Sequence, residues 1–178
     1  QENDILSMTL DEAIEFGLSN NRDIKINDIS IEKEKLSFVE AEKAWKDAED
    51  NKRYLTNLDG KLLVKGYYKE LAEMGLILAE KGKELSVEAT KLAIKNSYFN
   101  VLNKEENIRI KELNFERASK LLVIAKSKFE LGLSTKQEIL SAEANLESAK
   151  LDLQNAKDDL EYEKMNFNKV LGLPLDKK

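Results

Sequence analysis

Paired carboxylates are the residues of this sequence best suited to chemistry. They are Asp158-Asp159, Glu105-Glu106, and Glu161 with Glu163. Such pairs can share a proton in acid–base catalysis or hold a divalent cation. The chain contains no histidine and no cysteine, however, and these carboxylates lie among lysines in segments with a helical pattern. Mixed charge of this kind is typical of a solvated helix face, so we interpret the pairs as surface charges.

Other signs of catalysis or of a cofactor are also missing from the sequence. It has no glycine-rich phosphate loop, no nucleophile elbow and no metal-ligand spacing. We therefore expect no enzyme activity, no catalytic residue, no cofactor and no metal site. The net charge is −5 with both signs mixed along the chain, which argues against nucleic acid as a partner. No apolar run approaches the ~20 residues of a spanning helix, so we expect no membrane span.

The first residues, Gln1 to Asp4, are polar and do not resemble a charged and then apolar leader. This pattern predicts either a cytosolic protein or the mature form of an exported protein whose signal peptide has been removed.

Composition favours long helices over a compact globule. Charged residues make up 35% of the chain, aromatic residues 7%, and Pro174 is its single proline. These proportions are typical of long helices with a narrow core. We expect one all-α domain over residues 1–178, built as elongated antiparallel coiled-coil hairpins.

Capping residues place the first elements. Thr9 and Glu12 form a capping-box pattern that predicts a short helix at about 10–18, and Asn21 can cap a helix at about 22–55. A turn is expected at about 56–64, with Asp59-Gly60 as the reversal and Leu62-Leu63-Val64 as a weak candidate for a short strand.

The second half of the chain reads as one very long helix and its return. A helical pattern runs over about 65–131, which corresponds to roughly 95–100 Å at the α-helical rise. A tip turn at 132–134 separates it from a last helix at about 135–171. We expect the helix at 22–55 and the helix at 135–171 each to pack beside one half of the long helix.

Apolar residues at heptad spacing predict which faces are covered. The helix at 22–55 carries Ile24, Ile31, Phe38 and Trp45, with Ile29, Leu36 and Val39 beside them. The last helix carries Ile139, Ala142, Leu146, Ala149, Leu153, Ala156, Leu160, Glu163, Phe167 and Val170. For the long helix we predict a packing stripe of Leu71, Gly75, Leu78, Gly82, Leu85, Ala89, Leu92, Asn96 and Phe99. A second stripe, available for association into a ring, is Ile94, Tyr98, Val101, Ile108 and Phe115.

The turn around Gly132 is the strongest candidate for a binding site. Gly132 can end a helix in the left-handed conformation, and Ser134 or Thr135 can cap the next helix with help from Gln137 or Glu138. Leu131 and Leu133 would then be exposed at the end of a hairpin, which favours docking of a partner over a plain turn.

Several strings resemble one structural repeat of the TolC-like outer-membrane efflux protein family. They are Met8-Thr9-Leu10-Asp11-Glu12-Ala13-Ile14 followed by Ser19-Asn20-Asn21, then Tyr98-Phe99-Asn100-Val101-Leu102-Asn103, Gly132-Leu133-Ser134, and Ala142-Glu143-Ala144-Asn145-Leu146 before Leu171-Gly172. Their order and spacing, which extend over most of the chain, carry the resemblance.

The resemblance implies a role in efflux or secretion. In that family each protomer has two such repeats, and three protomers form a helical tunnel that an outer-membrane barrel completes. By position, Leu131, Gly132, Leu133 and Ser134 would dock a periplasmic adaptor protein, which links the duct to an inner-membrane transporter. Glu138 falls where the tunnel of that family can have its closing constriction, so the resemblance implies a gate at this residue.

Two departures from the family pattern are visible. The stretch between the first two long helices lacks the spanning strands that the family places there, and only one repeat is present. This chain would therefore need further copies, such as a trimer or hexamer ring, or a second repeat, to close a tunnel. The alternative function is a coiled-coil scaffold or spacer of the cell envelope that forms no channel.

Overall fold

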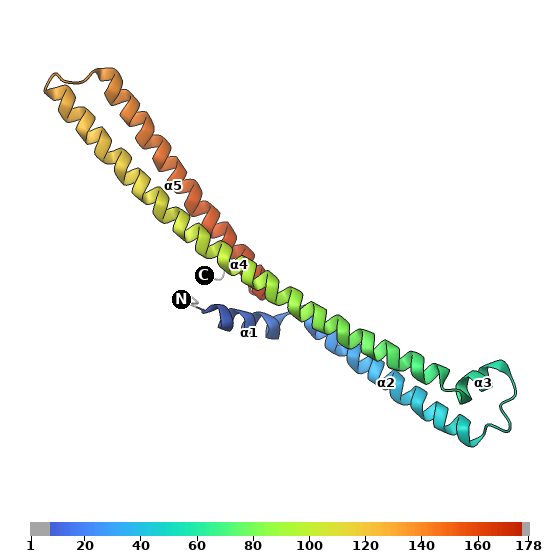
Figure 1. Ribbon diagram of the computed structural model, residues 1–178. Coiled ribbons are helices and arrows are strands. Elements are labelled where there is room, and N and C mark those ends of the chain that lie inside the picture. Colours follow the sequence, from blue (N-terminus) through green and yellow to red (C-terminus); the bar gives the residue numbers. More distant parts are fainter. Residues whose placement is uncertain (1–7, 176–178) are drawn as a thin grey trace. The chain divides into compact units, whose positions relative to one another are not determined.

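The structure, a computed structural model, describes residues 8–175, so the polar start at Gln1 to Asp4 lies outside the described residues. This range contains five α-helices (Figure 1): α1 (Leu10–Asn20), α2 (Arg22–Asp50), α3 (Leu58–Val64), α4 (Tyr67–Glu130) and α5 (Lys136–Leu171). No strand occurs among the described residues. The prediction of an all-α fold is confirmed.

The described residues divide into two compact units, residues 14–92 and residues 93–175 with 8–13. In the first unit α2 lies beside the first part of α4, and in the second α5 lies beside the rest of α4 (Figure 1). The 64 residues of α4 thus supply one helix to each unit.

Polar side chains fix where the helices begin. The Glu12 carboxylate accepts a hydrogen bond of 2.7 Å from the Thr9 N–H, and the Glu12 N–H donates to Thr9 Oγ1 at 3.3 Å, which completes a capping box. Asn21 Oδ1 accepts from the N–H groups of Asp23 and Ile24 at 2.8 and 3.0 Å. These contacts satisfy N–H groups that the first turn of a helix leaves without a partner.

The turn expected at 56–64 is wrong in detail, because most of it forms α3. Asn57 caps this helix through a 2.9 Å hydrogen bond from the Gly60 N–H to its Oδ1. Gly60 therefore lies inside a helix, and the weak strand candidate at 62–64 is helical. The residue that reverses the chain is Gly66, whose φ of 77° lies in the left-handed region.

Trp45 holds this reversal together. Its indole Nε1–H donates to the Val64 carbonyl at 3.2 Å, and the Lys69 ammonium lies 4.7 Å from the ring centroid. A Cβ added to Gly66 would lie 3.6 Å from Trp45 Nε1. These contacts explain why the α2 stripe ends in a large aromatic residue: Trp45 packs against the turn.

Ion pairs show the register between α4 and α5. Lys104 pairs with Asp159 at 2.7 Å, and Lys111 pairs with Asp152 at 2.9 Å. Seven residues forward in α4 thus correspond to seven residues backward in α5, so the two helices run antiparallel. The pairs of Lys164 with Glu105 and of Lys126 with Glu143 are further contacts between the two helices.

The stripes predicted for α2 and α5 face their neighbour. Ile24 and Ile31 are buried, and Phe38 and Trp45 are half-buried. Every residue of the α5 stripe is buried or half-buried. The heptad residues of these two helices pack as predicted, but Ile29, Leu36 and Val39, which the prediction placed beside the α2 stripe, are exposed.

The two stripes of α4 have exchanged roles. The predicted packing stripe points outward, since Leu71, Leu78, Leu85, Leu92 and Phe99 are all more than half exposed. The second stripe, reserved for association, is instead covered: Ile94 is fully buried, and Tyr98, Val101, Ile108 and Phe115 are half-buried. Asn96, assigned to the core by its place on the first stripe, is exposed.

Glycine-to-alanine substitutions test this assignment of faces. A Cβ at Gly82 would have no atom within 4 Å, so Gly82→Ala should raise the free energy of unfolding by about 1 kcal/mol through helix propensity. At Gly60 a Cβ would lie 2.7 Å from Asn57 Oδ1 and 2.8 Å from Leu55 Cβ. Gly60→Ala should therefore lower the free energy of unfolding by about 1–3 kcal/mol. Urea unfolding followed by circular dichroism measures both, and destabilisation by Gly82→Ala would contradict the outward orientation.

Candidate functional site

The tip, residues Leu131 to Ser134, is built as a tight helix stop. Gly132 has a φ of 73°, its N–H donates to the Phe129 carbonyl at 2.9 Å, and the Leu133 N–H donates to the Lys128 carbonyl at 2.8 Å. These two bonds are the Schellman arrangement that ends many helices at a left-handed glycine. The backbone of the tip is therefore fixed, although its side chains are not covered.

Two leucines flank this glycine without cover. Leu131 and Leu133 are each 74% exposed. A Cβ added to Gly132 would meet no atom within 4 Å, so the surface beside the glycine is also open. A rigid turn that presents two exposed leucines beside a residue without a side chain is suited to contact with another helix end.

Ser134 and Glu138 connect the tip to α5. The Ser134 hydroxyl donates to the Glu138 carboxylate at 2.7 Å, and the Glu138 N–H donates to Thr135 Oγ1 at 3.3 Å. Thr135 is the N-cap of α5. The sequence left two pairs of alternatives open. Thr135 rather than Ser134 caps α5. Glu138 rather than Gln137 makes the hydrogen bonds at this cap. In this chain Glu138 holds the start of α5, and its role at a constriction stays a prediction.

The carboxylate pairs form surface contacts. Asp159 bridges to Lys104, Glu105 bridges to Lys164, and Glu106 lies 3.4 Å from Arg109. Asp158 accepts from Gln154, and Glu163 accepts from Asn100. Across residues 8–175 the structure brings no three potential metal-ligating groups together. The interpretation of these residues as surface charges agrees with the contacts that they make.

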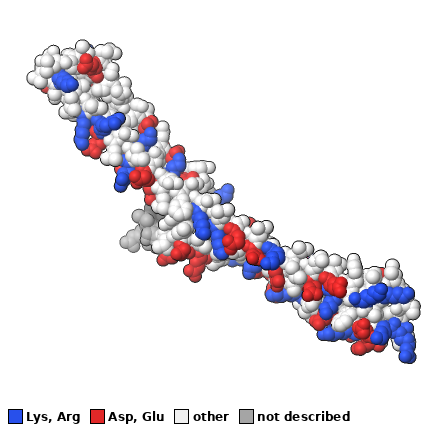
Figure 2. Space-filling model, viewed as in Figure 1, with Lys and Arg blue, Asp and Glu red and all other residues white. Residues whose placement is uncertain are grey.

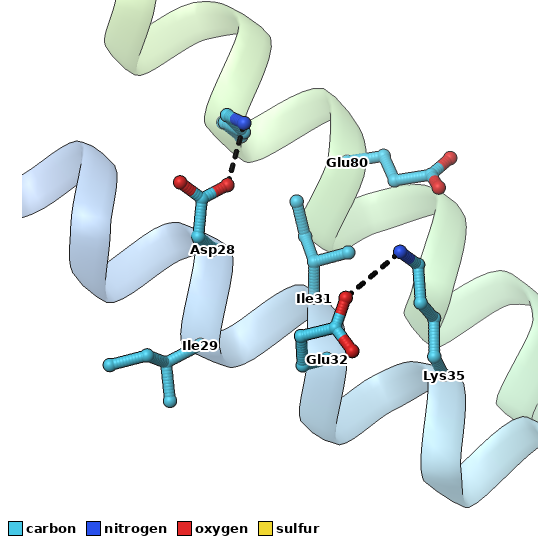
Figure 3. Close-up of a pocket in the computed structure, with 7 residues that line it drawn as sticks. Asp28, Ile29, Ile31, Glu32, Lys35 and Glu80 are labelled. Atoms are coloured by element: carbon cyan, nitrogen blue, oxygen red, sulfur yellow. Dashed lines mark hydrogen bonds and ion pairs between the residues drawn. The ribbon is translucent and has the colours of Figure 1, made fainter. Parts of the chain in front are cut away.

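A shallow groove of about 590 Å³ lies between α2 and α4 (Figure 3). Its rim carries the ion pairs Asp28–Lys83 at 2.6 Å and Glu32–Lys35 at 3.0 Å. Because these charges already neutralise each other, the groove offers little to a charged ligand. Figure 2 shows the same mixture of both signs along the visible face of the helices.

One apolar surface was not predicted. Ile29, Leu36 and Val39 of α2 are exposed, as are the leucines of the outward α4 stripe. The signal was present in the sequence, since Ile29 and Leu36 are seven residues apart and cannot share a face with Ile24 and Ile31. In the described part of the chain, none of the helices combines the length and the apolar content needed to cross a membrane.

Comparisons with protein-family models, with curated proteins and with solved structures found no match for this chain. The resemblance to the TolC-like family therefore rests on the strings given above.

The capping box of α1 predicts a pH dependence. Hydrogen bonds from Thr9, chiefly from its backbone N–H, lower the pKa of Glu12 below its ordinary value of 4.5. The Glu12 carboxylate therefore stabilises the folded helix above pH 4.5, and this contribution is lost as the pH falls through the lower folded pKa. Carboxyl ¹³C NMR should give a Glu12 midpoint below 4.5 that Thr9→Ala raises. The rise should be partial, because the backbone N–H of residue 9 remains in Thr9→Ala, and a Glu12 midpoint at or above 4.5 in the unsubstituted chain would contradict the capping box.

Proposed function

We propose that this chain is a component of a TolC-like efflux or secretion duct of the cell envelope. Its antiparallel helices, packed as coiled-coil hairpins, form part of a tunnel wall, and its tip docks a periplasmic adaptor protein that connects to an inner-membrane transporter. The chain is exported and acts without enzyme activity. Several copies, as a trimer or a hexamer, close the ring.

The outward stripe of α4 is the observation that carries this proposal. Large apolar residues recur every seven positions on a face that no part of the same unit covers. A heptad stripe of leucines is the pattern by which one helix packs against another. A second helix from another copy is therefore the natural partner, and repetition of that contact around an axis gives a ring.

The tip supports the second half of the proposal. Its fixed backbone and two exposed leucines present an apolar end to a partner, while Ser134 and Glu138 keep the start of α5 in place. By the family resemblance this partner is the hairpin tip of an adaptor. The Glu138 position is also where a gate of the duct would lie.

Association distinguishes the duct from the alternative, a spacer of the cell envelope that forms no channel. Native mass spectrometry and sedimentation of the full chain should show a trimer or a hexamer, because the exposed stripe drives lateral packing. A chain that stays monomeric at high concentration would favour the spacer.

Photo-crosslinking in the source cells tests the tip. A photoreactive amino acid at Leu133 should capture an adaptor with a helical hairpin, and the same amino acid at Leu151, an exposed leucine of α5, serves as the matched control. Gly132→Pro should abolish the capture, because proline cannot adopt a φ of 73°, while circular dichroism still shows long helices. Equal capture from Leu151, or capture that survives Gly132→Pro, would refute the tip assignment.

A further inference from the structure

We propose that copies of this chain join through one specific contact, in which the outer face of α2 in one copy packs against the outer face of α4 in the next. The contact lies entirely within residues 14–92. This inference rests on the proposed ring. In a ring whose axis is parallel to these helices, each copy is rotated relative to its neighbour but is not shifted along the helix axis.

The α2 side of the contact consists of two apolar knobs. Ile29 and Leu36 are 71% and 67% exposed. Figure 3 shows that Ile29 points away from α4, whereas Ile31 points toward it. Because Leu36 follows Ile29 by seven residues, both knobs lie on the same outer line of the helix.

The α4 side offers a matching row of holes. A knob fits between residues i, i+3, i+4 and i+7 of the facing helix. Leu78, Gly82 and Leu85 form three corners of one such hole, with Lys81 as the fourth. Gly82 makes it deep, because nothing lies within 4 Å of the place where its Cβ would be.

The next hole lies one heptad toward the start of α4. Leu71, Gly75 and Leu78 are three of its corners, and Met74 is the fourth. Glycine thus occupies the equivalent corner of both holes. At Gly75 the Glu34 carboxylate of the same copy lies 3.1 Å from the place where a Cβ would be, so this hole is shallower than the hole at Gly82.

Contacts inside one copy show which residues lie at the same height. Asp28 pairs with Lys83 at 2.6 Å, and the Asn21 amide donates to Thr90 Oγ1 at 3.3 Å. One residue forward in α2 therefore corresponds to one residue backward in α4. By this count Ile29 is level with Gly82, and Leu36 is level with Gly75.

A rotated neighbour keeps these heights. Its Ile29 consequently faces the hole at Gly82, and its Leu36 faces the hole at Gly75. Two knobs spaced by seven residues thus meet two holes spaced by seven residues, without any shift along the helix axis.

Side chains along one edge of the contact are also complementary. When two antiparallel helices pack in this way, residues that flank the contact on one side of the first helix meet the equivalent flanking residues of the second helix. At this edge Lys81 lies two residues beyond the level of Glu32, and Glu88 lies two residues beyond the level of Lys25, so each pair of long side chains can meet. Seven residues beyond Glu32, Val39 meets Met74, two exposed apolar residues. Opposite charges and apolar side chains therefore meet in the same register as the knobs.

The present partners of these charges do not oppose the contact. Glu32 pairs with Lys35, and Lys81 pairs with Glu84, in each case with an exposed residue of the same helix. Exposed pairs of this kind contribute little to stability and exchange partners readily.

Cysteine cross-linking tests the register, because the chain has no cysteine of its own. Full-length Glu32→Cys and Lys81→Cys proteins, mixed and oxidised, should form a disulfide-linked heterodimer. Each protein alone should not. Lys25→Cys mixed with Lys81→Cys is the matched control, since it is one heptad out of register and should give at least tenfold less product. Equal cross-linking in the control, or strong cross-linking of either protein alone, would overturn the proposed contact.

Two further substitutions test the chemistry of the contact. Glu32→Lys should weaken association on the order of tenfold, because like charges would meet, and Lys81→Glu in the same chain should restore it. Gly82→Leu should abolish association by filling the hole, while the free chain remains folded. Unchanged association in Gly82→Leu would overturn the contact. Glu73→Leu, which adds a leucine outside the proposed contact, is the control.

These results separate this contact from the proposed function. A ring seen by native mass spectrometry without the Glu32–Lys81 cross-link would refute the contact and leave the duct in place. A monomer would refute both the contact and the ring, and capture at the tip would then decide by itself whether the chain binds an adaptor.

Discussion

Each long helix of this protein has one long neighbour to pack against within its unit, and this constraint determines most of the structure. A single neighbour covers a single stripe of a helix, so the core is narrow. Among the described residues, Ile94 and Leu171 are the largest side chains that are fully buried. Stability must therefore come from many half-buried contacts and from capped helix ends, rather than from a central cluster.

The same constraint explains which parts of the fold could be predicted. α2 and α5 each have one strong stripe in register with their neighbour, so heptad spacing alone identified the covered face. Helix starts were predicted correctly where a side chain and a backbone N–H satisfy each other locally, as at Thr9, Asn21 and Thr135. Interactions that are short in sequence leave a clear pattern in the sequence.

The errors arose where two local patterns competed. α4 has two apolar stripes, and the more regular one, with Leu71 and Leu78, proved to be the outer one. The covered stripe is flanked by Lys104 and Lys111, which are half-buried. Their ammonium groups pair with Asp159 and Asp152 of α5. Asp59-Gly60 has the residue types of a turn, but the chain reverses at Gly66. This reversal was missed because the residue that packs against it, Trp45, lies about twenty positions away in the sequence. The tip could be located from its glycine, whereas the proposal that it binds a partner concerns a second molecule.

The seven-residue spacing of the ion pairs between α4 and α5 has a consequence for how the hairpin can change in length. Since Lys104 and Lys111 face Asp159 and Asp152, loss of one heptad from each helix would bring equivalent positions together again beneath the same Gly132 turn. Length and turn are thus separable properties of the hairpin. A lineage could lengthen or shorten its arms in steps of seven residues while the exposed leucines at the end stayed unchanged.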